Sequence, residues 1–386
     1  MRQIYLDYSA TTPVDPRVLD AMKPYYSGDY GNASSIHAYG RRARLALEES
    51  REVIARFIGA KQDELFFTSG GTESNNHAVN GIASARRREK RLKIVTSSIE
   101  HHAILEPVEM LQSDGWSATF VGVDTNGMVD LERLKNAIDD ETCLVSVIHG
   151  NNEVGTIQPL KEITAICKSK GITVHTDAVQ TVGKIPLSVD ELGIDVLSLT
   201  AHKLYGPKGI GAIYIRKGTK IDSFMKGGAQ ESNRRAGTEN VPLAVGFAKA
   251  IEICALEMDR DRQKWLRLRE LLRKRLFGEF EGLIFNGHET HSLPHILNIS
   301  FDASKQVIDG EALIMGMDLH GIAVTSGSAC TSGSLQPSHV LLAMGRDKQT
   351  ARATIRFSLG RSTSEEDIHD AVDALKEVVE KAREKG

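Results

Sequence analysis

A short apolar run in the middle of the chain ends in polar side chains that could do chemistry. Residues 196–199 have the composition of a buried strand, and Thr200, Ala201, His202 and Lys203 follow before a glycine-rich turn. In open α/β sheets, ligands bind at the carboxyl ends of the strands. A lysine there can form a Schiff base with an aldehyde cofactor if desolvation lowers its pKa. A solvated loop lysine is the alternative that this stretch alone leaves open.

Three other predicted strand-to-helix junctions carry groups that would complement such a lysine. Gly71 and Thr72 begin a helix, where backbone N–H groups and the helix dipole favour a single phosphate. Asp177 ends another strand, where a carboxylate can keep a ring nitrogen protonated, and Gln180 one turn later can reach a ring oxygen. His101 follows a third strand and can stack on an aromatic ligand or move protons near neutral pH.

Each junction also has a simpler interpretation when it is taken alone. Gly71 fits a plain glycine turn, Asp177 fits a helix cap, and His101 fits a surface histidine. The four junctions together are much less easily explained by coincidence. They predict a pyridoxal 5′-phosphate site, with phosphate at Gly71 and Thr72, the ring under His101, its nitrogen at Asp177 and the aldehyde on Lys203.

The elements that position these residues alternate between strand and helix. Strands are expected at residues 64–68, 93–97, 118–123, 142–148, 173–176, 196–199 and 211–215. Helices are expected at residues 41–57, 71–88, 102–113, 131–138 and 160–170. This rhythm predicts an α/β fold with a mostly parallel central sheet and helices on both faces.

The composition shifts after about residue 260. A charged amphipathic helix is expected at 266–277, followed by shorter strands and a last helix from residue 363. We therefore predict a large cofactor-binding domain over residues 15–260 and a smaller α+β domain. The smaller domain combines residues 1–14 with residues 261–386 and carries the loop around Cys330.

Several segments resemble the fold-type I, class V pyridoxal-phosphate enzymes, specifically the cysteine desulfurases of the NifS/IscS type. The segments are LDYSATTP (6–13), TSGGTESNN (68–76), EHHA (100–103), NNEVG (151–155), DAVQ (177–180), the lysine segment, RAGTEN (235–240), SGSACTSG (326–333) and IRFSLG (355–360). The resemblance runs nearly end to end. The Ser-Ala-Cys-Thr-Ser string around Cys330 is specific to the long-loop desulfurases.

The resemblance implies catalytic and substrate-binding roles for particular residues. Lys203 is implied to carry the cofactor and to move the substrate α-proton, while His101 takes the proton of the substrate thiol. Cys330 is implied to attack the substrate sulfur as a thiolate from a flexible loop, which requires help with its ionisation. Asn152 and Arg356 are implied to bind the substrate carboxylate, a bidentate task that suits a guanidinium.

The resemblance also implies how the phosphate is held. Thr72, Thr200 and His202 are expected to bind it within one subunit. Thr238 is expected to reach the phosphate of a partner subunit, which makes the protein a homodimer. Thr200 stands where a serine is common in relatives, and the hydroxyl group is kept.

The implied reaction converts L-cysteine to L-alanine and leaves a persulfide on Cys330. The sulfur then passes to an acceptor, such as an iron–sulfur scaffold protein. A selenocysteine lyase, a class V aminotransferase and a scaffold without catalysis are the alternatives. No metal site is predicted, apart from Cys330 as a possible ligand of a nascent cluster.

Charge and hydropathy limit the partners and the location. The chain has 386 residues, 48 Lys and Arg against 51 Asp and Glu, and a formal net charge of −3. This balance gives no general attraction to nucleic acid or anionic lipid, and the basic residues at 86–91 fit a helix C-terminus. No apolar run approaches the roughly 20 residues of a membrane helix, and the start lacks a signal-peptide core. A cytoplasmic protein is expected, without membrane or nucleic-acid partners.

Overall fold

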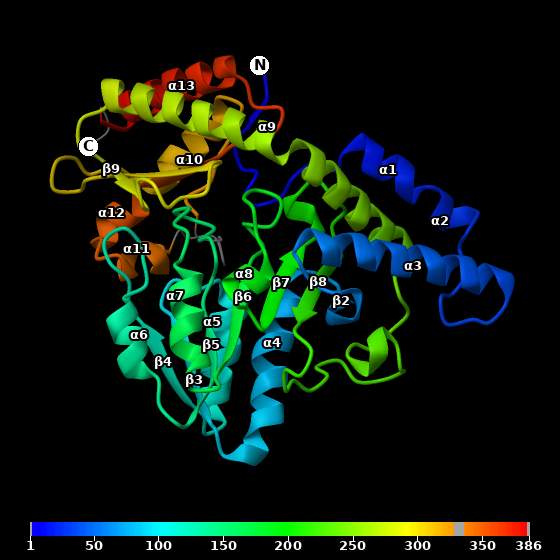
Figure 1. Ribbon diagram of the computed structural model, residues 1–386. Helices are drawn as coiled ribbons and strands as arrows, with labels where there is room; N and C mark the ends of the chain where they lie inside the picture. The colour runs from blue at the N-terminus through cyan, green and yellow to red at the C-terminus, as the bar shows by residue number, and fades with distance from the viewer. Residues whose placement is uncertain (1, 328–335, 384–386) are drawn as a thin grey trace.

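The computed structural model describes residues 2–327 and 336–383 and is built around a seven-stranded sheet (Figure 1). The strand order is β2-β8-β7-β6-β5-β3-β4. All pairs are parallel except those of β8, which runs antiparallel to both β2 and β7. The strands are β2 (Leu65–Thr68), β3 (Lys93–Ser97), β4 (Ser117–Val121), β5 (Thr142–Ser146), β6 (Thr173–Asp177), β7 (Val196–Thr200) and β8 (Gly211–Ile215).

Helices cover both faces of this sheet, as expected for strands that are apolar on both sides. One face packs on α3 (Ala38–Phe57), α6 (Leu131–Ala137), α7 (Leu160–Lys168) and the first half of α9 (Val241–Glu279). The other face packs on α4 (Gly71–Arg86) and α5 (His102–Ser113). The predicted fold class is therefore confirmed.

A second core lies beside the first, above the central sheet in Figure 1. It contains a three-stranded antiparallel sheet in the order β12-β10-β9, formed by β12 (Thr354–Ser358), β10 (Ile296–Phe301) and β9 (Leu283–Asn286). The second half of α9, with α10 (Gly310–Leu319) and α13 (Glu365–Arg383), covers this sheet. We propose that the two cores correspond to the two domains expected from the sequence.

The N-terminal strand belongs to the second core in space. Strand β1 (Ile4–Tyr5) pairs in parallel with β11 (Ile322–Ala323), far along the chain. The remaining helices are α1 (Pro16–Met22), α2 (Pro24–Ser27), α8 (Val189–Leu192), α11 (His339–Ala343) and α12 (Lys348–Arg352). Short 3₁₀ turns lie at Gln62–Glu64, Arg87–Glu89, Ala201–Lys203 and Glu231–Asn233.

Helix α9 differs from the expectation. The sequence predicts a separate helix at 266–277, whereas one helix of 39 residues runs from Val241 to Glu279. Asn240 caps its start by accepting the backbone N–H of Leu243, and no glycine or proline interrupts residues 247–277. The proposed domain boundary near residue 260 therefore falls inside a continuous helix. Among the described residues, none of the helices combines the length and the apolar character needed to cross a lipid bilayer.

A buried ion pair fixes a strained turn against α3. The guanidinium of Arg51 donates to the Glu231 carboxylate through two bonds of 2.6 and 2.9 Å, and the N–H of Phe67 donates to the same carboxylate at 2.8 Å. Glu231, Ser232 and Asn233 all have positive φ angles, between 44° and 64°. Non-glycine residues hold that conformation only where their surroundings impose it. The ion pair therefore stabilises the turn that precedes Thr238.

We expect Arg51→Met to lower the free energy of unfolding by about 3–5 kcal/mol, because it leaves the Glu231 carboxylate buried without its cation. Arg56→Met is the matched control on the same helix. Arg56 pairs with Glu52 at the exposed surface, so its loss should cost less than about 1 kcal/mol. Chemical denaturation of both variants measures the difference, and equal stabilities would contradict the prediction.

Candidate active site

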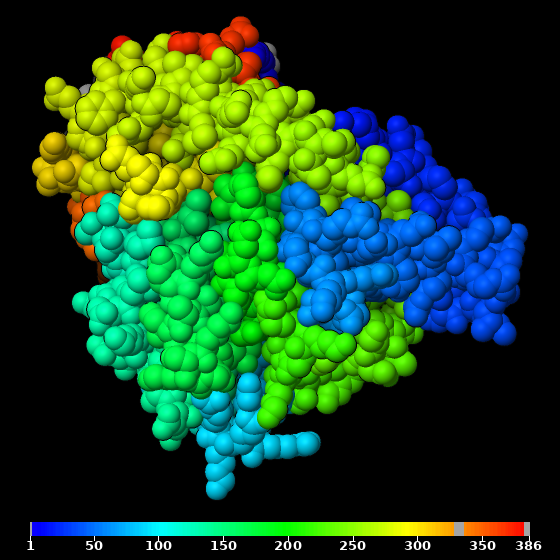
Figure 2. All heavy atoms as spheres, viewed as in Figure 1, coloured from blue at the N-terminus to red at the C-terminus, as the bar shows by residue number. Residues whose placement is uncertain are grey.

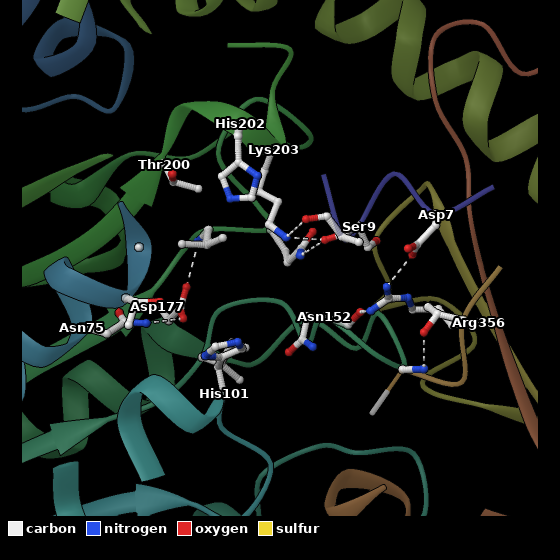
Figure 3. Close-up of a pocket in the computed structure, with 18 residues that line it drawn as sticks. Asp7, Ser9, Asn75, His101, Asn152, Asp177, Thr200, His202, Lys203 and Arg356 are labelled. Carbon is white, nitrogen blue, oxygen red and sulfur yellow. Dashed lines mark hydrogen bonds and ion pairs between the residues drawn. The ribbon is translucent and has the colours of Figure 1, made fainter. Parts of the chain in front are cut away.

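The carboxyl ends of the central strands meet at a cavity of about 380 Å³ that also reaches the second core (Figure 3). Ten of the residues expected from the sequence line it, namely Gly71, Thr72, His101, Asn152, Asp177, Gln180, Thr200, His202, Lys203 and Arg356. The cavity is also lined by Asp7, Ser9, Ala10, Asn75, Ile148, Val179, Thr325 and Gly327. Residues from distant parts of the chain thus share one space.

Lys203 projects into this cavity from the short turn after β7. Its amine donates hydrogen bonds to the backbone carbonyls of Ser9 and Ala10, the second at 2.6 Å. Desolvation by burial lowers the pKa of Lys203 to about 8, and the positive charge of Arg356 adds to the effect. A substantial fraction of this amine is therefore neutral and nucleophilic near neutral pH.

Asp177 ends β6, and each of its carboxylate oxygens accepts one N–H. The backbone N–H of Val179 donates to Oδ1 at 2.9 Å, and the side-chain amide of Asn75 donates to Oδ2 at 2.6 Å. Figure 3 shows Asp177 and Asn75 side by side at one side of the cavity. Gln180 donates to the carbonyl of Ser9 at 2.9 Å. Its Oε1 is buried and has no hydrogen-bond partner among the described residues.

His101 caps the start of α5 and faces the cavity. Its Nδ1 accepts the backbone N–H of Ala103 at 3.0 Å, so the neutral ring carries its proton on Nε2. Desolvation is the main cause that lowers the pKa of His101, which favours this neutral ring. The ring therefore meets a ligand as a hydrogen-bond donor. The expected removal of a thiol proton by His101 would first require the Ala103 bond to break.

The start of α4 provides a place for an anion. Gly70 caps the helix without a side-chain hydrogen bond, which leaves the first backbone N–H groups to a ligand. A Cβ on Gly71 would lie 2.7 Å from Val179 Cγ2, so only glycine lets the helix approach the end of β6 this closely. Thr72 follows and is exposed.

Thr200 and His202 lie on the opposite wall of the cavity from Asp177 in Figure 3. The Thr200 hydroxyl donates to the carbonyl of Ile210 at 3.0 Å and keeps its acceptor capacity. His202 Nδ1 lies 3.1 Å from the hydroxyl of Thr11. Desolvation and the nearby Lys203 lower the pKa of His202 to about 4, so this ring is neutral.

Arg356 extends from β12 of the second core. It donates to the Asp7 carboxylate at 2.7 Å and to the backbone carbonyl of Asn152 at 2.8 Å. Its Nε is buried and has no hydrogen-bond partner within the described part of the chain. The guanidinium is thus held in place while it keeps donors for a carboxylate ligand.

Sequence reasoning assigned no role to Asp7, Ser9 or Asn75. Asp7 and Ser9 lie in the segment of residues 6–13 that contributes to the resemblance, but their roles depend on the pairing of that segment with β12. Asn75 carries a weak local signal, since it follows Thr72 by three residues and therefore shares its helix face. The bond to Asp177 cannot be read from that spacing.

Two expected residues are not part of this cavity as described. Thr238 is exposed and is not among the residues that line the cavity. Cys330 lies outside the described residues. Within residues 2–327 and 336–383, no group of three or more His, Cys, Asp or Glu side chains is arranged to hold a metal ion.

The lowered pKa of Lys203 predicts that its amine reacts with electrophiles at a lower pH than an ordinary lysine does. The amine should react with a limiting acylating reagent half-maximally near pH 8, because deprotonation frees its lone pair as the pH rises through the pKa. At pH 7, about a tenth of such an amine is free, against fewer than about one in a thousand for an ordinary lysine with a pKa near 10.4. Peptide mass spectrometry of the cofactor-free protein measures the labelled fraction. A midpoint near pH 10 would contradict the assignment of this environment.

Comparison with known proteins agrees with the geometry over almost the whole chain. Residues 4–371 match the model of the aminotransferase class-V family. The cysteine desulfurase IscS of Dictyoglomus turgidum is 49% identical over 382 residues, which cover 99% of this chain and 96% of the relative. The cysteine desulfurase IscS of Methanosarcina thermophila is 45% identical over 99% of this chain and 93% of the relative.

Solved structures give the same result. A NifS-like protein superposes with a TM-score of 0.91 at 40% identity, covering 98% of this chain and 100% of that one. A NifS-like protein from Rickettsia africae superposes with a TM-score of 0.88 at 31% identity and the same coverage. The resemblance inferred from the sequence is confirmed, and the chain belongs to the aminotransferase class-V family, within its cysteine desulfurases of the NifS/IscS type.

Proposed function

We propose that the protein is a pyridoxal-phosphate-dependent cysteine desulfurase. It converts L-cysteine to L-alanine, leaves a persulfide on Cys330, and passes the sulfur to an acceptor such as an iron–sulfur scaffold protein. The observation that carries the proposal is one cavity holding a partly neutral lysine amine, a fixed carboxylate and a guanidinium. The names of relatives that align with 99% of the chain support the same reaction.

The residues around the cavity fit pyridoxal phosphate. The helix start at Gly71 offers N–H groups to a phosphate, and the unpartnered Oε1 of Gln180 can accept a ring hydroxyl. Asp177 is a carboxylate suited to a protonated ring nitrogen, and the Lys203 amine suits an aldehyde. The residues that would hold the cofactor are Gly71, Thr72, His101, Asp177, Gln180, Thr200, His202 and Lys203. When bound, pyridoxal phosphate supplies an aldehyde for the substrate amine and an electron sink for the substrate α-carbon.

The residues of this chain then position and deprotonate the substrate. The guanidinium of Arg356 binds the α-carboxylate of cysteine, with the side chain of Asn152 beside it. The Lys203 amine would take the α-proton of the substrate on its Nζ. The carbonyls of Ser9 and Ala10 hold that nitrogen in the cavity through the two hydrogen bonds described above.

Cys330 receives the sulfur. Its thiolate forms an S–S bond with the substrate sulfur while the carbon–sulfur bond of the substrate breaks, and protonation of the remaining three-carbon fragment gives alanine. The products are alanine and a Cys330 persulfide, so no outside oxidant or reductant is consumed in this step. An acceptor thiol can then take the outer sulfur by exchange.

The partner-subunit role of Thr238 leads us to propose a homodimer. Thr238 is exposed and is not among the residues that line the cavity of its own subunit. Large apolar side chains are exposed on the N-terminal segment, among them Ile36, which is 91% exposed, with Tyr26 and Tyr30 nearby in sequence. In Figure 2 this segment projects at one end of the molecule. A partner subunit on this surface would cover these side chains.

Replacement of Cys330 tests the reaction. With cysteine and a reductant, we expect Cys330→Ala to lower alanine and sulfide formation at least 100-fold, because no thiolate receives the sulfur. Cys167→Ala is the matched control, since burial raises the pKa of that thiol to about 12 and keeps it unreactive. Equal alanine formation by wild type and Cys330→Ala would refute the desulfurase assignment. Selenocysteine turnover by Cys330→Ser without cysteine turnover would indicate a selenocysteine lyase.

Mixed dimers test the role of Thr238. Lys203→Ala should remove the covalent cofactor link, and Thr238→Asp should repel the phosphate bound by the partner subunit. A dimer of one subunit of each kind contains one site with both native residues. We expect such mixed dimers to bind one cofactor per dimer with wild-type affinity, and both parent dimers to bind at least 10-fold more weakly. Failure of mixing to restore a tight site would contradict the shared site.

A further inference from the structure

We propose that Asn75 is a positioning residue that holds the carboxylate of Asp177 in place and aimed into the cavity. The inference rests on the proposed function, because the carboxylate is meant for the ring nitrogen of the cofactor. Its basis is the 2.6 Å hydrogen bond from Asn75 Nδ2 to Asp177 Oδ2. Both residues line the cavity, and Asn75 is only 1% exposed.

The fold holds this contact rigidly. Asn75 lies on α4 one turn after Thr72. The helix whose first N–H groups are open to an anion therefore also carries the Asn75 amide. Close packing of Gly71 on Val179 brings the start of α4 against the end of β6, where Asp177 lies. The distance between the start of α4 and the Asp177 carboxylate is therefore set by one helix turn and by the contact of Gly71 with Val179.

The side-chain oxygen of Asn75 argues against a purely structural role for this residue. Asn75 Oδ1 is buried and has no hydrogen-bond partner among the described residues, which is unfavourable for a polar atom. A leucine of similar size would avoid this cost in the interior of α4. The residue is therefore explained by what its Nδ2 does for Asp177.

The chemistry of an amide suits this task. The amide nitrogen donates a hydrogen bond, cannot take a proton from the carboxyl group, and has no charge that would compete for the ring. Donors on both oxygens fix the orientation of the carboxylate. A carboxylate held in this orientation would accept a hydrogen bond from a protonated ring nitrogen of the cofactor, and that proton would increase the electron demand of the ring.

The test uses the holoenzyme reconstituted with cofactor labelled with ¹⁵N in the ring. In wild type we expect a ¹⁵N chemical shift typical of a protonated ring nitrogen. In Asn75→Leu the shift should move toward that of the neutral ring, and kcat for cysteine should fall about 10- to 100-fold. KM should change less than about 2-fold, because Arg356 is untouched.

Asn76→Leu is the matched control. Asn76 is the next residue of the same helix, and its amide donates to the carbonyls of Thr72 and Ala103 at 3.0 and 3.5 Å instead of to Asp177. We expect a wild-type ¹⁵N shift from this variant. Asn75→Ala, which also removes the amide, serves if Asn75→Leu does not fold. In an Asp177→Asn background, Asn75→Leu should have less than about a 2-fold further effect on kcat, because its partner is already neutral.

The outcomes separate this inference from the proposed function. A wild-type ¹⁵N shift in Asn75→Leu or Asn75→Ala would overturn the inference and leave the cofactor assignment intact. Equal shifts in the Asn75→Leu and Asn76→Leu variants would overturn it as well. Failure of the wild-type protein to bind the labelled cofactor would instead overturn the proposed function, and the inference with it.

Discussion

Desolvation of a single amine is the constraint on which the site depends. Lys203 is enclosed where the end of β7 meets the N-terminal segment, and the backbone carbonyls of Ser9 and Ala10 are its hydrogen-bond partners there. Nearby positive and negative charges shift the pKa of Lys203 in opposite directions. Arg356 lowers the pKa of this amine, while Asp7 and Asp177 raise it. Burial is the largest effect and decides the sign, so the pKa falls to about 8. The amine is partly neutral near neutral pH because the fold removes water around it.

That enclosure requires the two cores to be held together. The N-terminal segment begins in the second core, where β1 pairs with β11, and then passes into the cavity at Asp7 and Ser9. At the junction, the buried amine of Lys184 lies 4.7 Å from the ring centroid of Trp265 and 5.1 Å from that of Tyr205. Trp265 comes from α9 and Tyr205 follows Lys203 closely in sequence. The contact therefore joins the helix that spans both cores to the segment that follows Lys203.

Much of the site could be predicted from the sequence for a geometric reason. Asp177 ends a buried strand, Lys203 and His101 closely follow two others, and parallel strands bring their carboxyl ends to one edge of a sheet. Their meeting therefore needs only the correct order of strands and helices. The pair formed by Arg356 and Asp7 could not be found in this way, because the two residues lie 349 positions apart. Their contact depends on how the second core is placed against the first, which no local pattern encodes.

The contact between Asn75 and Asp177 could not be predicted from the sequence pattern. The helix start at Gly71 is visible as a glycine turn after a strand, and the carboxylate is visible at the end of another strand. That the two are joined depends on the approach of α4 to within contact of Val179, which the absence of a side chain on Gly71 allows. Gly71 is a typical residue for the start of an anion-binding helix. It also lets α4 pack closely against Val179. The same close approach brings the amide of Asn75 to the carboxylate 102 residues further along the chain.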